Sequence, residues 1–513
     1  MKPNEKERPS FAFGAMLLLA SGILVKVIGA VFKIPLSNLL GDAGFGHFSA
    51  AYDVFSPFYA LAMGGLPVAA ARLIATENAT NGQAVGRERQ MHRVFIRLGL
   101  IFTLLFSALI PLLSRILSDG GQTTFALIAI APSVFLFFVI SAYRGSFEGR
   151  HDMKPTAVSD IIEACGKLGL GLLFVLLARR LTENSSYQAA AALAGITVGV
   201  AAATWYLFWK RPHLAAGEPS DLSDRQLLAL VWRPALTALL ISSAVGLIDA
   251  LTVAPVLHRS GAATSAALYG LRSKAHTLYN LVPSVSAMLG ISAVPSLAAA
   301  AQQKKLPELQ KQTKLLLKLS AVIVLPVGLG MAAISKPIMQ LLYTGHASAT
   351  VGARLLVIYG FAAVFAGLTV PIIHALQALD HQKSALRVLV GGVVVKSVLN
   401  VILIAVPGIG IVGAAWGTLA CYLVVFAVGL SLLCAAVKLP KIATVFFRPL
   451  FAAFVCSAVA KVALFKDSKW LTLGAIVLAG VVYLLLILLL RVFRREEIEE
   501  FLRRDQVKKE ETE

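Results

Sequence analysis

Four lysines stand inside long apolar runs of this sequence, where a charged side chain is costly: Lys26, Lys167, Lys396 and Lys461. A lysine at the centre of a bilayer costs about 2.5–3.5 kcal/mol on insertion scales, so it usually faces a wet cavity or an opposite charge. Lys461 can extend its side chain to the headgroup layer. Lys26 and Lys167 lie too deep for that. They predict a water-filled cavity or, alternatively, internal ion pairs.

Cationic side chains carried by apolar runs have the chemistry to bind phosphate or pyrophosphate. The candidate anion-binding residues are Lys26, Lys33, Arg72, Lys167, Lys274 and Lys396. Three carboxylates are candidates for pairing with them or for ion coupling: Asp53, Glu163 and Asp249. Glu163 and Lys167, together with Asp160, have the i, i+3, i+7 spacing of one helix face. A purely structural Glu163–Lys167 pair is therefore an alternative to a role in binding.

The elements that must position these side chains are membrane-spanning helices. The chain has 513 residues, of which 58% are hydrophobic and 14% charged, whereas soluble domains carry about 25% charged residues. Its apolar runs are continuous, and each is long enough to cross a hydrocarbon layer of about 30 Å as a helix. We predict an all-α polytopic protein with about fourteen spans, near residues 11–33, 47–71, 94–117, 123–143, 156–178, 187–209, 228–254, 275–299, 315–334, 351–376, 384–406, 409–437, 443–464 and 470–491.

The distribution of positive charge predicts the orientation of these spans. Of the 47 Lys and Arg residues, 32 fall on segments that would be inside if the N-terminus is inside, and 11 fall on outer segments. Positively charged loops stay in the cytoplasm, so both termini are predicted to be cytoplasmic. The net charge of +20 is explained by these loops, and no nucleic-acid partner is expected.

An internal repeat predicts the domain organisation. The stretch "GGLPVAAARLIA" (64–75) matches "GISAVPSLAAA" (290–300) at an offset of 228, and Lys167 aligns with Lys396 at an offset of 229. Such a repeat predicts two six-helix lobes related by a pseudo-twofold axis along the membrane normal, with a central cavity. The predicted domains are lobes at 1–226 and 227–440, two additional helices at 441–492, and a charged cytoplasmic tail at 493–513.

Motifs for catalysis and metal binding are missing from the sequence. It contains no G-x-x-x-x-G-K-[ST], no H-E-x-x-H and no G-x-S-x-G, and its four cysteines have no metal-ligand spacing. We therefore expect no enzymatic activity, no catalytic residues, no metal and no cofactor. Coupling to Na⁺, H⁺ or the membrane potential remains open.

Two stretches carry a resemblance to a known family. "GGLPVAAARLIATE" and "YRGSFEGRHDMKPTAVSDIIEACGKLGL" resemble the stage V sporulation protein B-like polysaccharide-transport group of the multidrug/oligosaccharidyl-lipid/polysaccharide (MOP) exporter superfamily. The likeness covers roughly residues 11–440. It implies a V-shaped pair of six-helix lobes, often with two extra helices. It also implies flipping of undecaprenyl-pyrophosphate-linked sugars, such as peptidoglycan precursors, across the bacterial cytoplasmic membrane.

The related MurJ-type lipid II flippases use arginines in their first span, and this sequence has Lys26 and Lys33 at similar places. Those flippases also pair an arginine with a glutamate in the eighth span. Here "RSKAHTLYN" (272–280) offers Arg272, Lys274 and His276 but no matching acid. Because of this difference from the MurJ-type flippases, the resemblance does not imply that lipid II itself is the cargo.

The sequence is compatible with three functions. The first is a flippase for a lipid-linked saccharide, whose partners would be that substrate, the bilayer and proteins of cell-wall synthesis. The second is a multidrug or cation antiporter of the same superfamily, which Asp53 and Asp249 favour and the lysines oppose. The third is a non-transporting membrane scaffold for cell-wall synthesis, in which the buried charges are merely paired.

Overall fold

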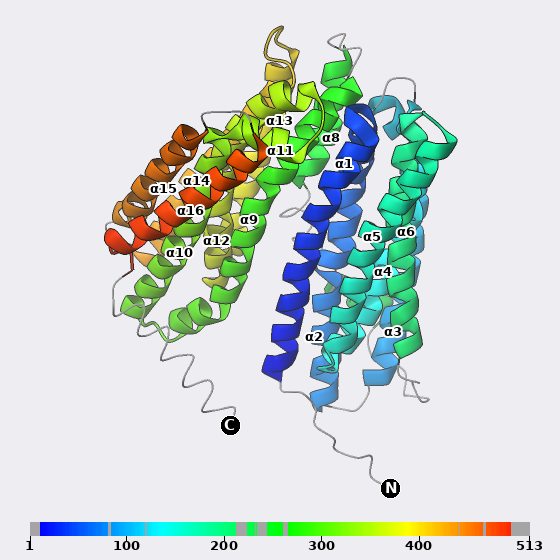
Figure 1. Ribbon diagram of the computed structural model, residues 1–513. Helices are drawn as coiled ribbons and strands as arrows, with labels where there is room; N and C mark the ends of the chain where they lie inside the picture. The colour runs from blue at the N-terminus through cyan, green and yellow to red at the C-terminus, as the bar shows by residue number, and fades with distance from the viewer. Residues whose placement is uncertain are drawn as a thin grey trace. The chain divides into compact units, whose positions relative to one another are not determined.

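The computed structural model describes residues 11–80, 84–117, 121–211, 223–230, 232, 244–259, 265–440, 442–464 and 468–493. Nearly all of these residues are helical and none of them forms a strand. The predicted all-α polytopic membrane class is thereby confirmed. The helices (Figure 1) are α1 (Phe11–Gly64), α2 (Leu66–Thr80), α3 (Ala84–Leu117), α4 (Thr124–Gly149), α5 (Lys154–Leu181), α6 (Ser185–Lys210), α8 (Ala244–Arg259), α9 (Ser265–Gln302), α10 (Leu306–Ala333), α11 (Ser335–Leu342), η2 (Ser348–Gly352), α12 (Ala353–Ala378), α13 (Gln382–Ala405), α14 (Val412–Val437), α15 (Ala443–Ala463) and α16 (Lys469–Leu489).

Twelve helical segments in the described residues are long and apolar enough to cross a membrane. The first of them, Leu24–Ala75, has 52 residues and contains the end of the first predicted span and the whole of the second. Gly41 divides it at φ 67° and ψ −176°, a conformation that is essentially restricted to glycine. Residues 231 and 233–243 of the seventh predicted span, 228–254, lie outside the described residues. The total of fourteen spans therefore stays a prediction.

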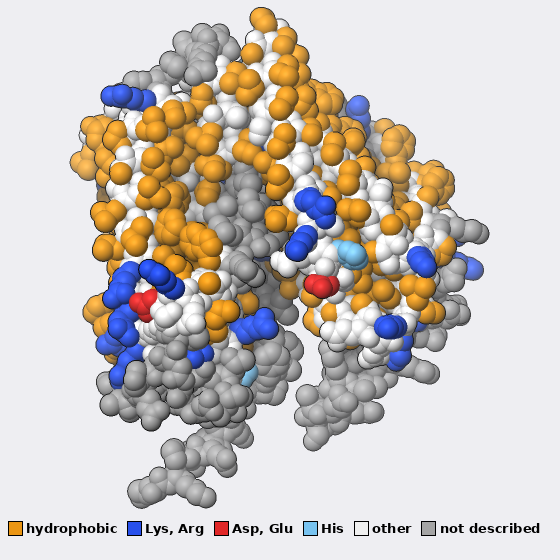
Figure 2. Space-filling view, turned by 180° about the vertical axis from the view of Figure 1, so that it is seen from behind, with side chains coloured by type: hydrophobic (Ala, Val, Ile, Leu, Met, Phe, Trp, Pro, Cys, Tyr) orange, Lys and Arg blue, Asp and Glu red, His pale blue; other side chains and the backbone are white. Residues whose placement is uncertain are grey.

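The outer surface of the helices is strongly apolar. Hydrophobic side chains cover long stretches of the face drawn in Figure 2. Val462, Leu488 and Leu489 are 80%, 72% and 76% exposed, respectively. In a soluble protein such patches would promote association, whereas lipid chains solvate them. Together with the length of the helices, this surface identifies a multi-pass membrane protein.

The chain packs as two compact units. The first unit consists of Met1–Thr277 and Val393–Gly417, and the second consists of Leu278–Gly392 and Thr418–Glu513. Helices α9, α13 and α14 each belong partly to both units. This division follows packing, whereas the predicted lobes follow the sequence repeat. The predicted lobes at 1–226 and 227–440, their axis and the central cavity therefore stay predictions. The predicted additional helices are α15 and α16, and the tail beyond residue 493 lies outside the described residues.

The core of the first unit contains a row of aromatic side chains along α1. Phe45, Phe48 and Phe55 are each 1% exposed, at the spacing that places side chains on one helix face. The rings of Phe45 and Phe48 stack with centroids 5.8 Å apart, and Phe55 lies 5.8 Å from Phe137 of α4. This row fixes the rotation of α1, and with it the direction of the polar residues between the aromatics.

The second unit has its own hydrophobic core. Leu317 of α10, Ile372 of α12 and Leu433 of α14 are fully buried within it. The hydroxyl of Tyr483 on α16 donates a hydrogen bond to the carbonyl of Val322 on α10 at 2.7 Å. The second predicted extra helix is therefore attached to this unit.

Helices α5 and α6 pack through glycines, which let two backbones approach closely in a membrane. A Cβ atom at Gly195 would lie 2.5 Å from the Cα atom of Gly171, and one at Gly166 would lie 2.5 Å from that of Gly199. These distances are below any normal contact, so the crossing depends on the absence of side chains. Because α5 carries Glu163 and Lys167, the crossing also helps to position those charges.

We expect Gly195→Val to destabilise the protein by about 1–3 kcal/mol, the usual cost of overpacking. The neighbouring atoms are backbone, so they cannot move aside as a side chain would. The measurement is the midpoint of thermal unfolding of the purified protein in detergent. The matched control is Gly169→Val on α5, where a Cβ atom meets nothing within 4 Å. Equal midpoints for the two variants would show that the crossing tolerates a side chain.

Candidate functional site

The second half of α1 approaches α9 closely at two glycines. A Cβ atom at Gly46 would collide with the carbonyl of Ala266, and one at Gly270 would collide with the carbonyl of Asp42. Such contacts between small residues bring helix backbones together in membranes. The polar side chains of α9 thereby come within reach of the carboxylates of α1.

Two carboxylates of α1 receive these contacts. Lys274 Nζ lies 2.6 Å from Asp42 Oδ1. The Tyr269 hydroxyl donates a hydrogen bond to Asp53 Oδ2 at 2.7 Å, and Arg272 Nη1 lies 3.7 Å from the same oxygen. The side chains of Arg272 and Lys274 are 0% and 1% exposed. A charge buried so completely needs opposite charge or hydrogen bonds nearby.

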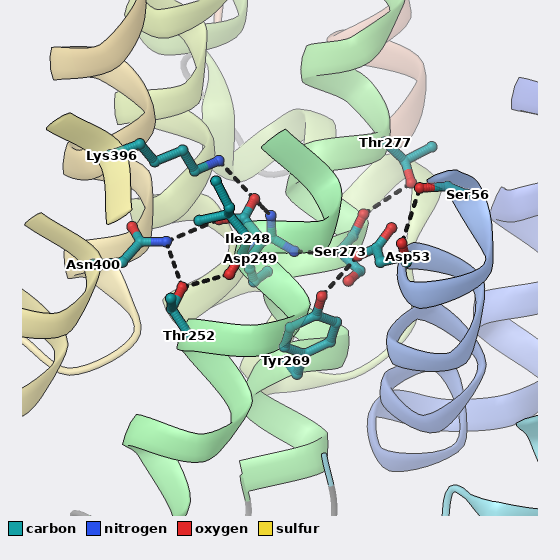
Figure 3. Close-up of polar contacts among 11 residues, drawn as sticks. Asp53, Ser56, Ile248, Asp249, Thr252, Tyr269, Ser273, Thr277, Lys396 and Asn400 are labelled. Atoms are coloured by element: carbon teal, nitrogen blue, oxygen red, sulfur yellow. Dashed lines mark hydrogen bonds and ion pairs between the residues drawn. The ribbon is translucent and has the colours of Figure 1, made fainter. Parts of the chain in front are cut away.

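Asp249 on α8 is the centre of a second set of contacts (Figure 3). Its Oδ2 accepts hydrogen bonds from Arg272 Nη2 and from Lys396 Nζ, the latter at 2.7 Å. Its Oδ1 accepts a hydrogen bond from Asn400 Nδ2 at 3.0 Å. The same amide group lies 3.0 Å from Thr252 Oγ1. The side chains of Asp249, Arg272 and Lys396 are all 0% exposed, so one carboxylate is shared by two cations in the interior.

Helical spacing explains how each element contributes two members. Asp249 and Thr252 are three residues apart on α8, and Lys396 and Asn400 are four apart on α13, so each pair shares a face. On α9, Tyr269 and Arg272 are also three residues apart. Two carboxylates, Asp53 and Asp249, stand opposite two cations, so the charges of this network balance.

A small polar cavity of about 10 Å³ adjoins Asp53, which is room for about one water molecule. It is lined by Lys33, Phe48, Ser49, Tyr52, Asp53, Ser273, His276 and Thr277. The ammonium group of Lys33 lies 5.3 Å from the centroid of the Tyr52 ring. Within the described residues, Lys33 makes no ion pair, and the buried Ser273 hydroxyl has no hydrogen-bond partner. The cavity therefore offers a cation and a hydroxyl that can receive an anionic oxygen.

A separate cluster joins α4 and α5. Arg144 Nη1 lies 2.6 Å from Asp160 Oδ1, and its Nη2 lies 3.1 Å from Glu163 Oε2. Lys167 Nζ lies 2.5 Å from Glu163 Oε1 and 5.5 Å from the centroid of the Tyr59 ring. Asp160, Glu163 and Lys167 thus share the helix face that their spacing predicts, and Arg144 connects that face to α4.

The two lysines that the repeat aligns have different kinds of partners. Lys167 takes a carboxylate four residues earlier on its own helix. The position equivalent to Glu163 before Lys396 is Gly392, where a Cβ atom would collide with Val425. Lys396 therefore depends on Asp249, from a different helix, for its counter-charge.

The structure distributes the predicted anion-binding residues among three environments. Lys167, Lys274 and Lys396 are ion-paired with carboxylates, which is the alternative that the sequence left open. Lys26 on α1 and Arg72 on α2 are exposed. Lys33 is half-buried beside the small polar cavity, close to Asp53 and His276.

Sequence reasoning missed several members of this site. The stretch around Arg272 contains no acidic residue that could pair with it. The acids come from other helices instead: Asp249 and Asp53 for Arg272, and Asp42 for Lys274. Asn400 could have been predicted from the sequence, because it lies four residues after Lys396 and therefore on the same helix face.

Comparisons with known proteins give the chain its family and fold. The family model described as "Polysaccharide biosynthesis protein" matches residues 11–300. Stage V sporulation protein B of Bacillus subtilis (strain 168) is 26% identical over 513 residues, which cover 96% of this chain and 97% of that protein.

Two solved structures share the fold. Lipid II flippase MurJ in its inward closed conformation aligns with a TM-score of 0.73 at 15% identity, over 93% of this chain and 99% of that chain. An inward-facing MATE multidrug resistance transporter of the MOP superfamily aligns with a TM-score of 0.67 at 15% identity, over 83% and 99% of the two chains. The fold is thus the one that MurJ and the MATE transporters share. Because the family model matches more than half of the chain, this protein belongs to the polysaccharide biosynthesis protein family.

Proposed function

We propose that this protein is a MOP-superfamily transporter that moves a saccharide linked to undecaprenyl pyrophosphate across the bacterial cytoplasmic membrane by alternating access. Peptidoglycan precursors belong to this class of cargo. Membership of the polysaccharide biosynthesis family and the fold shared with a lipid II flippase support this function. The excess of Lys and Arg on the predicted inner segments supports cytoplasmic termini.

The environment of Lys33 is the observation that carries the proposal. Its ammonium group is half-buried, makes no ion pair within the described residues and adjoins a cavity with the Ser273 hydroxyl. Phosphate oxygens are strong acceptors for such donors. The Asp53 carboxylate lines the same cavity, but it already accepts a hydrogen bond from Tyr269 and lies 3.7 Å from Arg272 Nη1.

The paired lysines fit the proposal as residues that can exchange partners. Lys274, Lys167 and Lys396 are paired with Asp42, Glu163 and Asp249, respectively. A pyrophosphate group can compete for such ammonium groups as the protein changes conformation. Lys26 and Arg72, which are exposed, complete the proposed basic path. Asp53 and Asp249 would set the pairing and are the proposed residues for coupling to Na⁺, H⁺ or the membrane potential.

A multidrug antiporter is the second candidate, because a MATE transporter has the same fold. Organic cations would need Asp53 or Asp249 as a counter-charge. Asp249 is fully buried and already bonded to Arg272 and Lys396, and Asp53 accepts a hydrogen bond from Tyr269. A drug cation would have to displace these groups, so the geometry favours the lipid-linked saccharide.

The two functions are separated by a transport assay on the purified protein in vesicles. We expect a fluorescent undecaprenyl-pyrophosphate-linked oligosaccharide to cross faster than in protein-free vesicles, measured by the accessibility of the probe to an external quencher. Uptake of an organic cation in exchange for H⁺ or Na⁺, with no acceleration of the lipid probe, would establish the antiporter instead. If neither probe moves faster than in protein-free vesicles, both transport functions are rejected.

A further inference from the structure

A groove of about 1160 Å³ lies between α3 and α4, on the first unit and away from the ion-paired residues. This volume exceeds the range of about 300–1,000 Å³ that is usual for small-ligand sites. Its walls include Ser107, Pro111 and Arg115 of α3 and Ile128, Pro132 and Phe135 of α4. The proposed transport function uses none of these residues.

The groove is bounded by contacts at both ends. At one end, a Cβ atom on Gly99 would lie 2.9 Å from the Cβ atom of Phe138, and the rings of Phe102 and Phe138 stack at 5.3 Å. At the other end, the hydroxyls of Ser114 and Thr124 are hydrogen-bonded at 2.5 Å. The two helices therefore contact each other at both ends of the groove and are separated between these ends.

Two prolines line the groove between these ends. Pro111 and Pro132 both lie inside their helices, line the groove and are exposed. Proline has no backbone N–H and bends a helix away from the carbonyl four residues earlier. Those carbonyls belong to Ser107 and Ile128, which also line the groove.

The walls and the end of the groove have different chemistry. Ile128, which is 54% exposed, lies with Phe135 and Leu136 on apolar walls that match a hydrocarbon chain. Arg115 is exposed in the last turn of α3 and is the one charged side chain among the described residues that line the groove. A guanidinium group at the end of a spanning helix is at the level of lipid headgroups and binds a phosphate with two parallel hydrogen bonds.

We propose that this groove is a binding site for an anionic phospholipid, with an acyl chain between α3 and α4 and the phosphodiester at Arg115. A single guanidinium group balances the single charge of a phosphodiester, whereas a pyrophosphate would call for more cations than the groove supplies. The predicted orientation places Arg115 on an outer segment, so the lipid would come from the outer leaflet.

The experiment is a lipid titration of the purified full-length protein followed by native mass spectrometry. Phosphatidylglycerol and phosphatidylcholine with identical acyl chains are compared. We expect the protein to retain one phosphatidylglycerol in preference to phosphatidylcholine. Arg115→Gln should weaken phosphatidylglycerol binding at least tenfold, because it removes hydrogen bonds between charged groups, and should weaken phosphatidylcholine, whose headgroup is neutral overall, by less. Arg115→Lys should retain part of the preference.

A second variant tests the groove itself. Ser107→Trp should fill it and weaken both lipids, whereas Ala108→Trp, at the neighbouring exposed position outside the groove, should weaken neither. Equal retention of the two lipids by the native protein, or unchanged binding in both Arg115→Gln and Ser107→Trp, would overturn the proposal. Preferential retention of undecaprenyl phosphate over phosphatidylglycerol in competition would also overturn it, because the groove would then hold the carrier lipid.

Discussion

Replacing Asp249 with asparagine should destabilise the folded protein by about 3–5 kcal/mol, the cost of leaving buried charges without their partner. Arg272 and Lys396 both contact this carboxylate and are fully buried. An asparagine side chain keeps an acceptor oxygen but removes the negative charge that offsets two cations. We expect a lower midpoint of thermal unfolding in detergent and a smaller yield of folded protein from membranes.

The same prediction can be tested by restoring the balance of charge. In the double variant Asp249→Asn with Lys396→Met, the number of cations falls with the number of carboxylates, so part of the lost stability should return. Lys461→Met, at an exposed lysine on α15, is the matched control and should add no stability to Asp249→Asn. If Asp249→Asn unfolds at the native midpoint, the network does not contribute to stability as the contacts indicate.

Removal of the charge at Lys33 should slow translocation of the lipid-linked saccharide at least tenfold, because one hydrogen bond to a charged group contributes about 1.5–3 kcal/mol. The fold should survive Lys33→Ala, since this ammonium group makes no ion pair within the described residues. Lys33→Arg should keep most of the rate, because a guanidinium group also binds phosphate. The measurement is the initial rate of probe translocation in vesicles.

Two comparisons make the Lys33 result specific. Lys461→Ala removes a lysine from another spanning helix and should leave the rate unchanged. The thermal unfolding midpoint of Lys33→Ala should match that of the native protein, which separates a loss of binding from a loss of structure. A native transport rate in Lys33→Ala would remove the main support for pyrophosphate binding at this cavity, even if the protein still transports the lipid.

The sequence by itself determined the properties that depend on local composition and spacing. Continuous apolar runs predict spanning helices because each run must satisfy its backbone hydrogen bonds within itself. The face shared by Asp160, Glu163 and Lys167 follows from helical spacing alone, and the structure reproduces it. The family resemblance rests on short stretches of residues and likewise requires no knowledge of the tertiary structure.

Only the tertiary structure decided which charges meet. Lys274 and Asp42 are 232 residues apart in the chain, and Lys396 and Asp249 are 147 apart. Helical periodicity gives the face on which a residue lies but not the helix that this face contacts. Those contacts depend on places where two helix backbones come close together, such as Gly46 and Gly270. Both positions must lack a side chain, although they are far apart in the sequence. For this reason, the candidate anion-binding lysines are divided by the fold into the ion-paired Lys167, Lys274 and Lys396, the exposed Lys26 and the half-buried Lys33.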